Sequence, residues 1–322
     1  MKVVTSGSAY VDIDAYAGAV AYAELLQAQG QEAKAASTAP FNESISKSVR
    51  AWQAPLDTQY TPSESDTFNL VDVSDPAYFD KIVDIARVDE VIDHHLGFEQ
   101  HWQDRIGDRA NIEFIGAACT LVYERWETAG LLREMSVLSA RLLICAILDN
   151  TLNFGAKVTT PRDTKAYEAL LAKADLPDDW TAQYFTECQE AILQNPVEAI
   201  SNDTKTLPFK SFKQPICFGQ LVVWDVSQVL AVHQKDLQTA LAGKNSNWFM
   251  NLVCVGERKS YFVTDNPAVQ AWLSKLISVE FDGSVAVADR MWLRKEVIKQ
   301  DIDKSRENDP LLNILGLIGQ VS

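Results

Sequence analysis

The 322-residue chain has few basic residues, few cysteines and no long apolar run. Lys and Arg number 29 against 44 Asp and Glu, and the formal net charge of -15 repels nucleic-acid backbones. The five cysteines are scattered and include no C-x-x-C pair, which argues against a disulfide framework or a zinc ribbon. Acidic residues interrupt the apolar N-terminal stretch. We therefore expect a soluble, cytoplasmic protein that binds neither membranes nor extended nucleic acid.

The length of the chain and a break in its sequence pattern predict two domains. Hydrophobic residues make up 47% of the chain, enough for a large buried core. Asn195-Pro196 separates a helical stretch from a segment in which strands and helices are expected to alternate. We expect an α/β domain over residues 1–194, built on a parallel sheet with helices on both faces, and a smaller mixed α/β domain over 195–308. Residues 309–322 form an apolar tail, which we expect to dock on its own domain or on a partner subunit.

Acidic and imidazole side chains follow the apolar strands of the first domain. They are Asp12 and Asp14 after residues 2–5, Asp72 and Asp75 in residues 68–76, and Asp93, His94 and His95 in residues 88–97. Ligands of open α/β sheets bind outside the carboxyl ends of the strands. These side chains are therefore expected to converge on one crevice. A helix over 136–148 ends at Asp149-Asn150 and could bring a fourth group there.

A set of carboxylates with one imidazole favours Mn²⁺, Mg²⁺ or Co²⁺ over thiolate-bound zinc. Gathered carboxylates repel one another unless cations lie between them. Two ions bridged by one Asp could hold a phosphoryl group and acidify a water molecule. The alternative is that these are ordinary loop and cap residues. Adjacent histidines on an extended chain also point in opposite directions. Spacing alone leaves both interpretations open.

Seven segments resemble the motifs of the DHH phosphoesterase superfamily with a DHHA2-type C-terminal domain. VIDHHLG is similar to the superfamily signature, and the D-I-D of residues 12–14 is similar to the first motif. The other similar segments are LVDVSDP, GAACTLVYERW, AILDNTLNF with TTPRD, NDTKTLPF and MWLRKE. The resemblance covers the chain up to the tail. It implies a relative of the family II manganese-dependent inorganic pyrophosphatases and the prune-like exopolyphosphatases.

The resemblance also implies roles for individual residues. The implied metal ligands are Asp12, Asp14, Asp72 and His94, with Asp149 or Asn150 as a further ligand, and the implied cofactor is a pair of Mn²⁺ ions (or Mg²⁺ or Co²⁺) bridged by Asp72. Asp93 is implied to orient His94, and His95 to face the substrate, so that Asp72, Asp93 and His95 form the catalytic set. The implied phosphate-binding residues are His95, Lys205, Arg294 and Lys295; the alternative for the three cations is an ordinary solvated surface.

Four positions depart from the pyrophosphatase pattern. They are Ser8 in place of a metal-binding His, Val73 in place of a substrate-side His, Asn150 at a carboxylate position with Asp149 just before it, and Leu293 in place of Ser. Fewer or less charged ligands weaken metal binding, so one metal site is expected to be weak.

The sequence predicts a divalent-metal-dependent phosphohydrolase that cleaves phosphoanhydride bonds in pyrophosphate or short-chain polyphosphate. One alternative is a phosphodiesterase on nucleotides or short oligonucleotides, although the sequence shows no aromatic residues interleaved with basic ones for stacking bases. Another is a catalytically weakened metal- or nucleotide-binding regulatory protein. The expected partner is a small phosphorylated substrate, and a homodimer is left open.

Overall fold

The computed structural model describes residues 1–307. The chain divides into two compact units, Met1–Cys188 and Gln189–Ser322. The division falls within helix α7 (Trp180–Gln194), shortly before the domain boundary predicted from the sequence. The apolar tail predicted over 309–322 lies outside the described residues.

A six-stranded sheet forms the centre of the first unit, in the order β3-β2-β1-β4-β5-β6. All five neighbouring pairs are parallel. The strands are β1 (Lys2–Thr5), β2 (Ala33–Ala36), β3 (Leu56–Asp57), β4 (Thr67–Val71), β5 (Val88–Asp93) and β6 (Ala110–Ile112). The strand order reverses between β1 and β4, and ligands of such sheets bind outside the carboxyl ends of the strands at this point.

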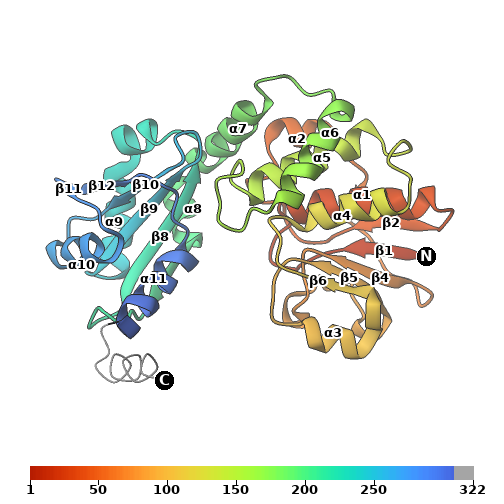
Figure 1. Ribbon diagram of the computed structural model, residues 1–322, viewed down its shortest axis with the longest axis horizontal. Coiled ribbons are helices and arrows are strands. Elements are labelled where there is room, and N and C mark those ends of the chain that lie inside the picture. The colour runs from red at the N-terminus through yellow and green to blue at the C-terminus, as the bar shows by residue number, and fades with distance from the viewer. Residues whose placement is uncertain (308–322) are drawn as a thin grey trace, which may run out of the picture. The chain divides into compact units, whose positions relative to one another are not determined.

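Helices cover both faces of this sheet, so the predicted fold class is confirmed. Figure 1 shows α1 (Ile13–Ala28) and α4 (Ala118–Thr128) on one side of the strands and α3 (Glu99–Ile106) on the other. α1 also packs on α5 (Val137–Asn150). This unit also contains α2 (Lys47–Ala51), α6 (Pro161–Ala174) and the first part of α7, with short turns η1 (Pro76–Tyr78), η2 (Ile85–Arg87) and η3 (Gly107–Arg109).

Helix α1 lies unusually close to the sheet because its residues are small. The helix begins after Asp12, whose side chain accepts a hydrogen bond from the Ala15 amide at 2.9 Å. A Cβ atom at Gly18 would lie only 2.5 Å from Cγ1 of Val71 on β4. Val71 directly precedes Asp72, so this close packing also positions the carboxyl end of β4.

A second mixed sheet forms the centre of the second unit, in the order β11-β12-β10-β9-β8-β7. β8 and β9 are parallel, and the other pairs are antiparallel. The strands are β7 (Thr204–Leu207), β8 (Ile216–Val223), β9 (Trp248–Cys254), β10 (Lys259–Val263), β11 (Phe281–Asp282) and β12 (Val285–Ala288). The helical segments are α8 (Pro196–Asn202), η4 (Val229–His233), α9 (Gln234–Lys244), α10 (Pro267–Ile277) and α11 (Arg294–Glu307).

This second sheet is also packed on both faces. Ile200 of α8 and Leu237 of α9 belong to one buried cluster, together with Met250 of β9. Leu273 of α10 and Val297 of α11 belong to the other. The mixed α/β character predicted for the second domain is confirmed.

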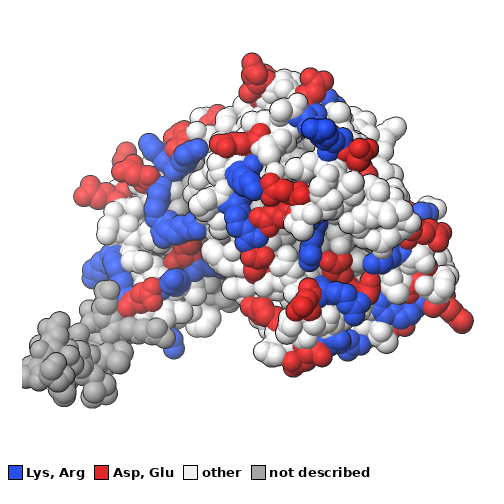
Figure 2. Space-filling view, turned by 45° about the vertical axis from the view of Figure 1, so that its right-hand side comes forward, with Lys and Arg blue, Asp and Glu red and all other residues white. Residues whose placement is uncertain are grey.

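The surface carries both signs of charge. Figure 2 shows acidic and basic side chains interspersed over the visible face. Within residues 1–307, no helix combines the length and the apolar character that crossing a bilayer would require.

Replacing Gly18 by Ala tests the close packing of α1 on β4. The added methyl group would collide with the stiff, β-branched side chain of Val71, so we expect a loss of about 1–3 kcal/mol in the free energy of unfolding. Urea denaturation measures the loss. Gly243→Ala is the matched control, since a Cβ atom there meets no neighbour in helix α9 and should stabilise the protein by about 0.5–1 kcal/mol. An unchanged midpoint for Gly18→Ala would contradict the packing.

Candidate metal centre

Asp72, His94 and His95 form a cluster at the carboxyl ends of β4 and β5. One ligand atom from each lies within 4.8 Å of the others. Nε2 of His94 lies 3.3 Å from Oδ1 of Asp72 and 3.8 Å from Oδ2 of Asp14. The structure therefore brings together residues that are up to 81 positions apart in the sequence, counting from Asp14 to His95 (95 − 14 = 81).

Asp12 and Asp14 reach the site from the start of α1. The carboxylate of Asp14 is fully buried and accepts hydrogen bonds from the backbone amides of Ala118 and Cys119, both at 2.8 Å. These amides lie at the N-terminus of helix α4, where the helix dipole favours negative charge. Asp12 caps α1 and lines the cavity beside the cluster. The helix ends thus hold both carboxylates in place.

The ring of His94 is oriented for metal binding. Its Nδ1 lies 3.1 Å from the carbonyl oxygen of Ile115. A carbonyl oxygen can only accept, so Nδ1 carries a proton and donates it to Ile115, and Nε2 is the atom that would bind a cation beside Asp72 and Asp14. A backbone carbonyl in this role is a common way of fixing the tautomer of a histidine ligand.

Asp93 orients a different histidine from the one predicted. Its Oδ1 accepts a hydrogen bond from Nδ1 of His95 at 2.9 Å and from the backbone amides of His94 and His95. The prediction that Asp93 orients the ring of His94 is wrong, because Ile115 fills that role. The expectation that adjacent histidines point apart is also wrong. β5 ends at Asp93, and the two rings lie 4.5 Å apart, edge to face.

The electrostatics of the cluster fit a divalent cation. Burial and the charges of Asp12 and Asp14 raise the pKa of Asp72 well above its usual range. Burial opposes the charged form of His94, yet the hydrogen bond and charge of Asp72 raise its pKa to about 10. Within the described part of the chain, Oδ1 of Asp72 has no well-formed hydrogen bond although it is buried. A cation there would relieve the carboxylate repulsion and complete the coordination of this oxygen.

The backbone of Asp72 is itself strained. Its φ angle of +62° lies in the left-handed region, which residues other than glycine rarely adopt. Such strain costs about 1–3 kcal/mol and is common at functional sites, where the surrounding structure fixes the direction of a side chain. Here the conformation turns the chain at the end of β4, where Asp72 lines the cavity.

The end of α5 offers one carboxylate and one amide. Oδ1 of Asp149 lies 3.0 Å from the hydroxyl of Tyr184, and burial raises the pKa of Asp149 to about 7, with added effect from the charges of Asp12 and Asp14. The amide nitrogen of Asn150 donates to the carbonyl of Ala146 at 3.3 Å. Coordination of a metal ion by Asp149 or Asn150 stays a prediction.

A cavity of about 490 Å³ adjoins the cluster. Asp12, Asp72, Asp93 and His95 line one part of it. Ser8 and Val73, two of the positions that depart from the pyrophosphatase pattern, also face it. The substitutions therefore alter the wall of this cavity.

No protein-family model matches the chain as a whole or in part. A protein of Bacillus licheniformis described as "Probable manganese-dependent inorganic pyrophosphatase" is 26% identical over 304 residues, covering 92% of this chain and 96% of that protein. A protein of Listeria welshimeri with the same description is 26% identical over 231 residues, covering 71% and 73%.

Solved structures agree on the fold. A protein of Methanococcus jannaschii assigned to the family II inorganic pyrophosphatases superposes with a TM-score of 0.63 at 18% identity, covering 95% of this chain and 99% of that one. Over most of its length the chain is similar to proteins described as manganese-dependent inorganic pyrophosphatases. An exopolyphosphatase-related protein of Bacteroides fragilis superposes with a TM-score of 0.52 at 14% identity, covering 97% and 93%. The resemblance stated from the motifs is confirmed.

Two motifs of the second unit meet through an ion pair. Nη1 of Arg294 lies 2.6 Å from Oδ1 of Asp203, and the Arg294 side chain is only 12% exposed. Lys205 on β7 and Lys295 at the start of α11 are exposed. Arg294 is thus held by its own unit, while the two lysines face solvent. Contact of all three with phosphate stays a prediction.

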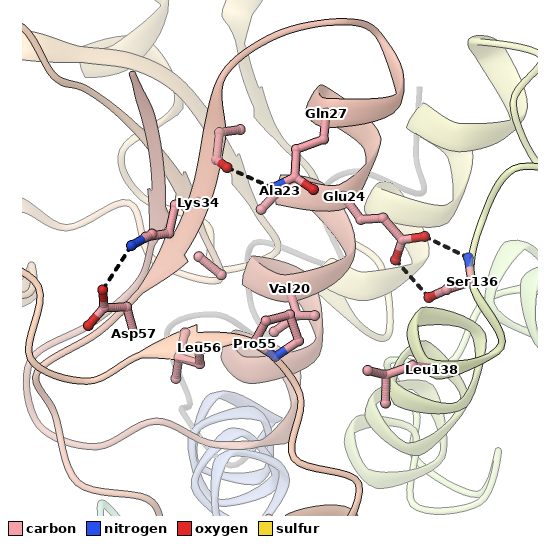
Figure 3. Close-up of a pocket in the computed structure, with 12 residues that line it drawn as sticks. Val20, Ala23, Glu24, Gln27, Lys34, Pro55, Leu56, Asp57, Ser136 and Leu138 are labelled. Atoms are coloured by element: carbon pink, nitrogen blue, oxygen red, sulfur yellow. Dashed lines mark hydrogen bonds and ion pairs between the residues drawn. The ribbon is translucent and has the colours of Figure 1, made fainter.

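A second cavity, of about 520 Å³, lies beside α1, β2 and β3 (Figure 3). Its polar side chains are already paired with one another or with the backbone. Glu24 accepts hydrogen bonds from Ser136, and Lys34 forms an ion pair with Asp57 at 3.0 Å. We assign no function to this cavity.

Sequence reasoning missed the residues that support the ligands. Asp163 is fully buried and accepts hydrogen bonds from the amide of Gly116 at 3.1 Å and the hydroxyl of Thr120 at 2.6 Å. These bonds hold the turn that carries the Ile115 carbonyl, which contacts His94. The same turn leads into α4, whose first amides donate to Asp14. These residues lie in two segments singled out from the sequence, TTPRD and GAACTL. Only the structure shows that the two segments are hydrogen-bonded to each other.

Asp72→Asn tests the centre of the cluster. The amide keeps the shape of the side chain but removes a charge, so we expect Mn²⁺ affinity to fall at least about 100-fold, more than the loss of an outer partner usually causes. Isothermal titration with Mn²⁺ measures the affinity. The control is Asp84→Asn, since Asp84 is an exposed carboxylate that caps η2. Unchanged affinity in Asp72→Asn would refute its role as a ligand.

Gly116→Ala tests the supporting turn. A Cβ atom at Gly116 would lie 2.6 Å from Oδ2 of Asp163 and 2.7 Å from a methyl group of Thr151. Displacement of this turn should weaken Mn²⁺ binding about 10–100-fold, although residue 116 supplies no ligand. The same titration measures it, with Gly243→Ala as the control. Full affinity in a folded Gly116→Ala protein would show that the turn does not position His94.

Proposed function

We propose that the chain is a divalent-metal-dependent phosphohydrolase that cleaves phosphoanhydride bonds, as found in pyrophosphate and short polyphosphates. The observation that carries the proposal is the convergence of Asp14, Asp72 and His94 at the carboxyl ends of the parallel strands. The descriptions of the relatives favour Mn²⁺ as the ion. We further propose that Asp72 bridges two ions, with the site nearest Ser8 the weaker, since a hydroxyl is a poorer ligand than an imidazole.

The metal centre would be held by Asp12, Asp14, Asp72 and His94, with Asp149 as an added ligand. A divalent ion at such a site supplies positive charge to phosphoryl oxygens and lowers the pKa of water. The chain contributes the rigid placement of these carboxylates. Because α1 and α4 fix Asp12 and Asp14 before substrate arrives, little reorganisation is needed during the reaction.

His95 is the proposed proton donor to the departing phosphate. Nδ1 is bound to Asp93, so Nε2 is left to face the cavity, and the side chain is 56% exposed. Asp93 acts here as the orienting carboxylate, which holds the ring in one direction and stabilises its charged form. The Asp93 hydrogen bond raises the pKa of His95, with a further contribution from Asp72. We propose Lys205, Arg294 and Lys295 as additional phosphate contacts.

The direct test is phosphate release by the purified protein with Mn²⁺, Mg²⁺ or Co²⁺, using pyrophosphate, tripolyphosphate and longer polyphosphate. Metal-dependent release that Asp72→Asn lacks would support the proposal. Stoichiometric Mn²⁺ binding without release from any phosphorylated substrate would favour the second candidate, a metal-binding regulatory protein. That alternative is motivated by Ser8, Val73 and Asn150, the three departures nearest the site.

His95→Gln separates proton transfer from metal binding. Loss of a general acid lowers kcat about 100- to 10,000-fold, and we expect a fall in that range. Mn²⁺ affinity should change little, because the proposed ligand set does not include His95. Steady-state kinetics and Mn²⁺ titration on the same preparation check both parts. Loss of Mn²⁺ binding would instead identify His95 as a metal ligand.

Cytoplasmic localisation and a homodimer stay predictions.

A further inference from the structure

Three large apolar side chains stand exposed on the cavity beside the metal cluster. Tyr10 is 54% exposed, Tyr78 is 61% exposed and Leu96 is 56% exposed, and all three line the cavity. They come from three different loops, after β1, at the end of η1 and after β5. Apolar side chains gathered around a cavity indicate a binding surface rather than chance exposure.

The two tyrosine loops are fixed to each other by their backbones. The amide of Ser8 donates to the carbonyl of Tyr78 at 2.8 Å, and Gly7 pairs with Phe79 as an isolated antiparallel bridge. A Cβ atom at Gly7 would lie 3.4 Å from the Tyr78 carbonyl oxygen, so the loops approach closely. The segments that carry Tyr10 and Tyr78 are therefore held in place before a ligand arrives, which lowers the entropic cost of binding.

A bare inorganic phosphate chain would leave part of the wall of this cavity uncovered. Among the described residues that line it, none is a lysine or an arginine. Val73 and Phe98 extend the apolar wall. A pyrophosphate ion has only charged oxygens to present, so it would leave this wall in contact with water. A substrate with an apolar, planar portion would cover the wall, and its phosphate would face Asp72 and His95.

We propose that the substrate is a nucleotide, with phosphates at the metal cluster and a base against Tyr10 and Tyr78. The inference rests on the proposed phosphohydrolase function and names its substrate class. Aromatic rings bind bases by stacking without regard to base identity. Tyr10 and Tyr78 thus supply the aromatic surface that the sequence did not reveal, since they are separated by 68 positions (78 − 10 = 68).

The experiment compares two triphosphates, one with a nucleoside and one without. We expect kcat/KM for adenosine triphosphate to exceed that for tripolyphosphate by at least about 10-fold, in keeping with the strength of a stacked base. Tyr78→Ala and Tyr10→Ala should each lower this ratio about 10-fold, and Tyr78→Phe should preserve it. The control is Leu171→Ala on α6, an exposed side chain outside the cavity, which should leave the ratio unchanged. Equal kcat/KM values, with a ratio that no tyrosine variant alters, would overturn the inference while the proposed function stands.

A binding measurement decides the inference even without turnover. In the presence of Mn²⁺, β,γ-methylene adenosine triphosphate should bind about 10-fold more tightly than methylenediphosphonate, and Tyr78→Ala should remove the difference. If this preference is found but no phosphate is released from any substrate, the cavity binds nucleotides as inferred and the hydrolase proposal falls. Equal binding of the two compounds by the wild-type protein would overturn the inference.

Discussion

Repulsion among buried carboxylates is the constraint on which the site depends. Asp14 is fully buried, Asp72 is nearly so, and both lie near Asp12, so their charges are not screened by water. Burial and the neighbouring carboxylates raise the pKa of Asp72, and the hydrogen bond and charge of Asp72 raise the pKa of His94. A divalent ion held by these residues would offset the repulsion between the carboxylates. The surrounding structure therefore maintains an arrangement that is unfavourable until the ion binds.

The fold maintains it with backbone groups more than with side chains. The amides at the start of α4 hold Asp14, and the carbonyl of Ile115 holds His94. Asp163 in turn holds the loop that carries both, through Gly116 and Thr120. Backbone groups cannot change rotamer, so ligand geometry is set once the sheet and α4 have formed. The geometry therefore depends on these backbone hydrogen bonds more than on the identity of neighbouring side chains.

Much of the fold and part of the site could be predicted from the sequence. Apolar runs identified β1, β4 and β5, and their polar ends identified Asp12, Asp14, Asp72 and His94, because parallel strands end at a common edge. The short strands β2 and β3 were missed, since AKAA and LD carry no alternating pattern. The predicted partner of Asp93 was wrong, because the orientation of the two histidine rings depends on the bend of the chain after β5. Tyr10 and Tyr78 could not be paired, because their proximity rests on a backbone contact between distant loops.

The central claim is that Asp14, Asp72 and His94 together bind a divalent ion. The most direct measurement is anomalous diffraction from crystals of the full chain grown with Mn²⁺. The account predicts a strong anomalous peak in contact with Oδ1 of Asp72 and Nε2 of His94. Crystals saturated with Mn²⁺ that show no peak beside these two atoms would contradict it.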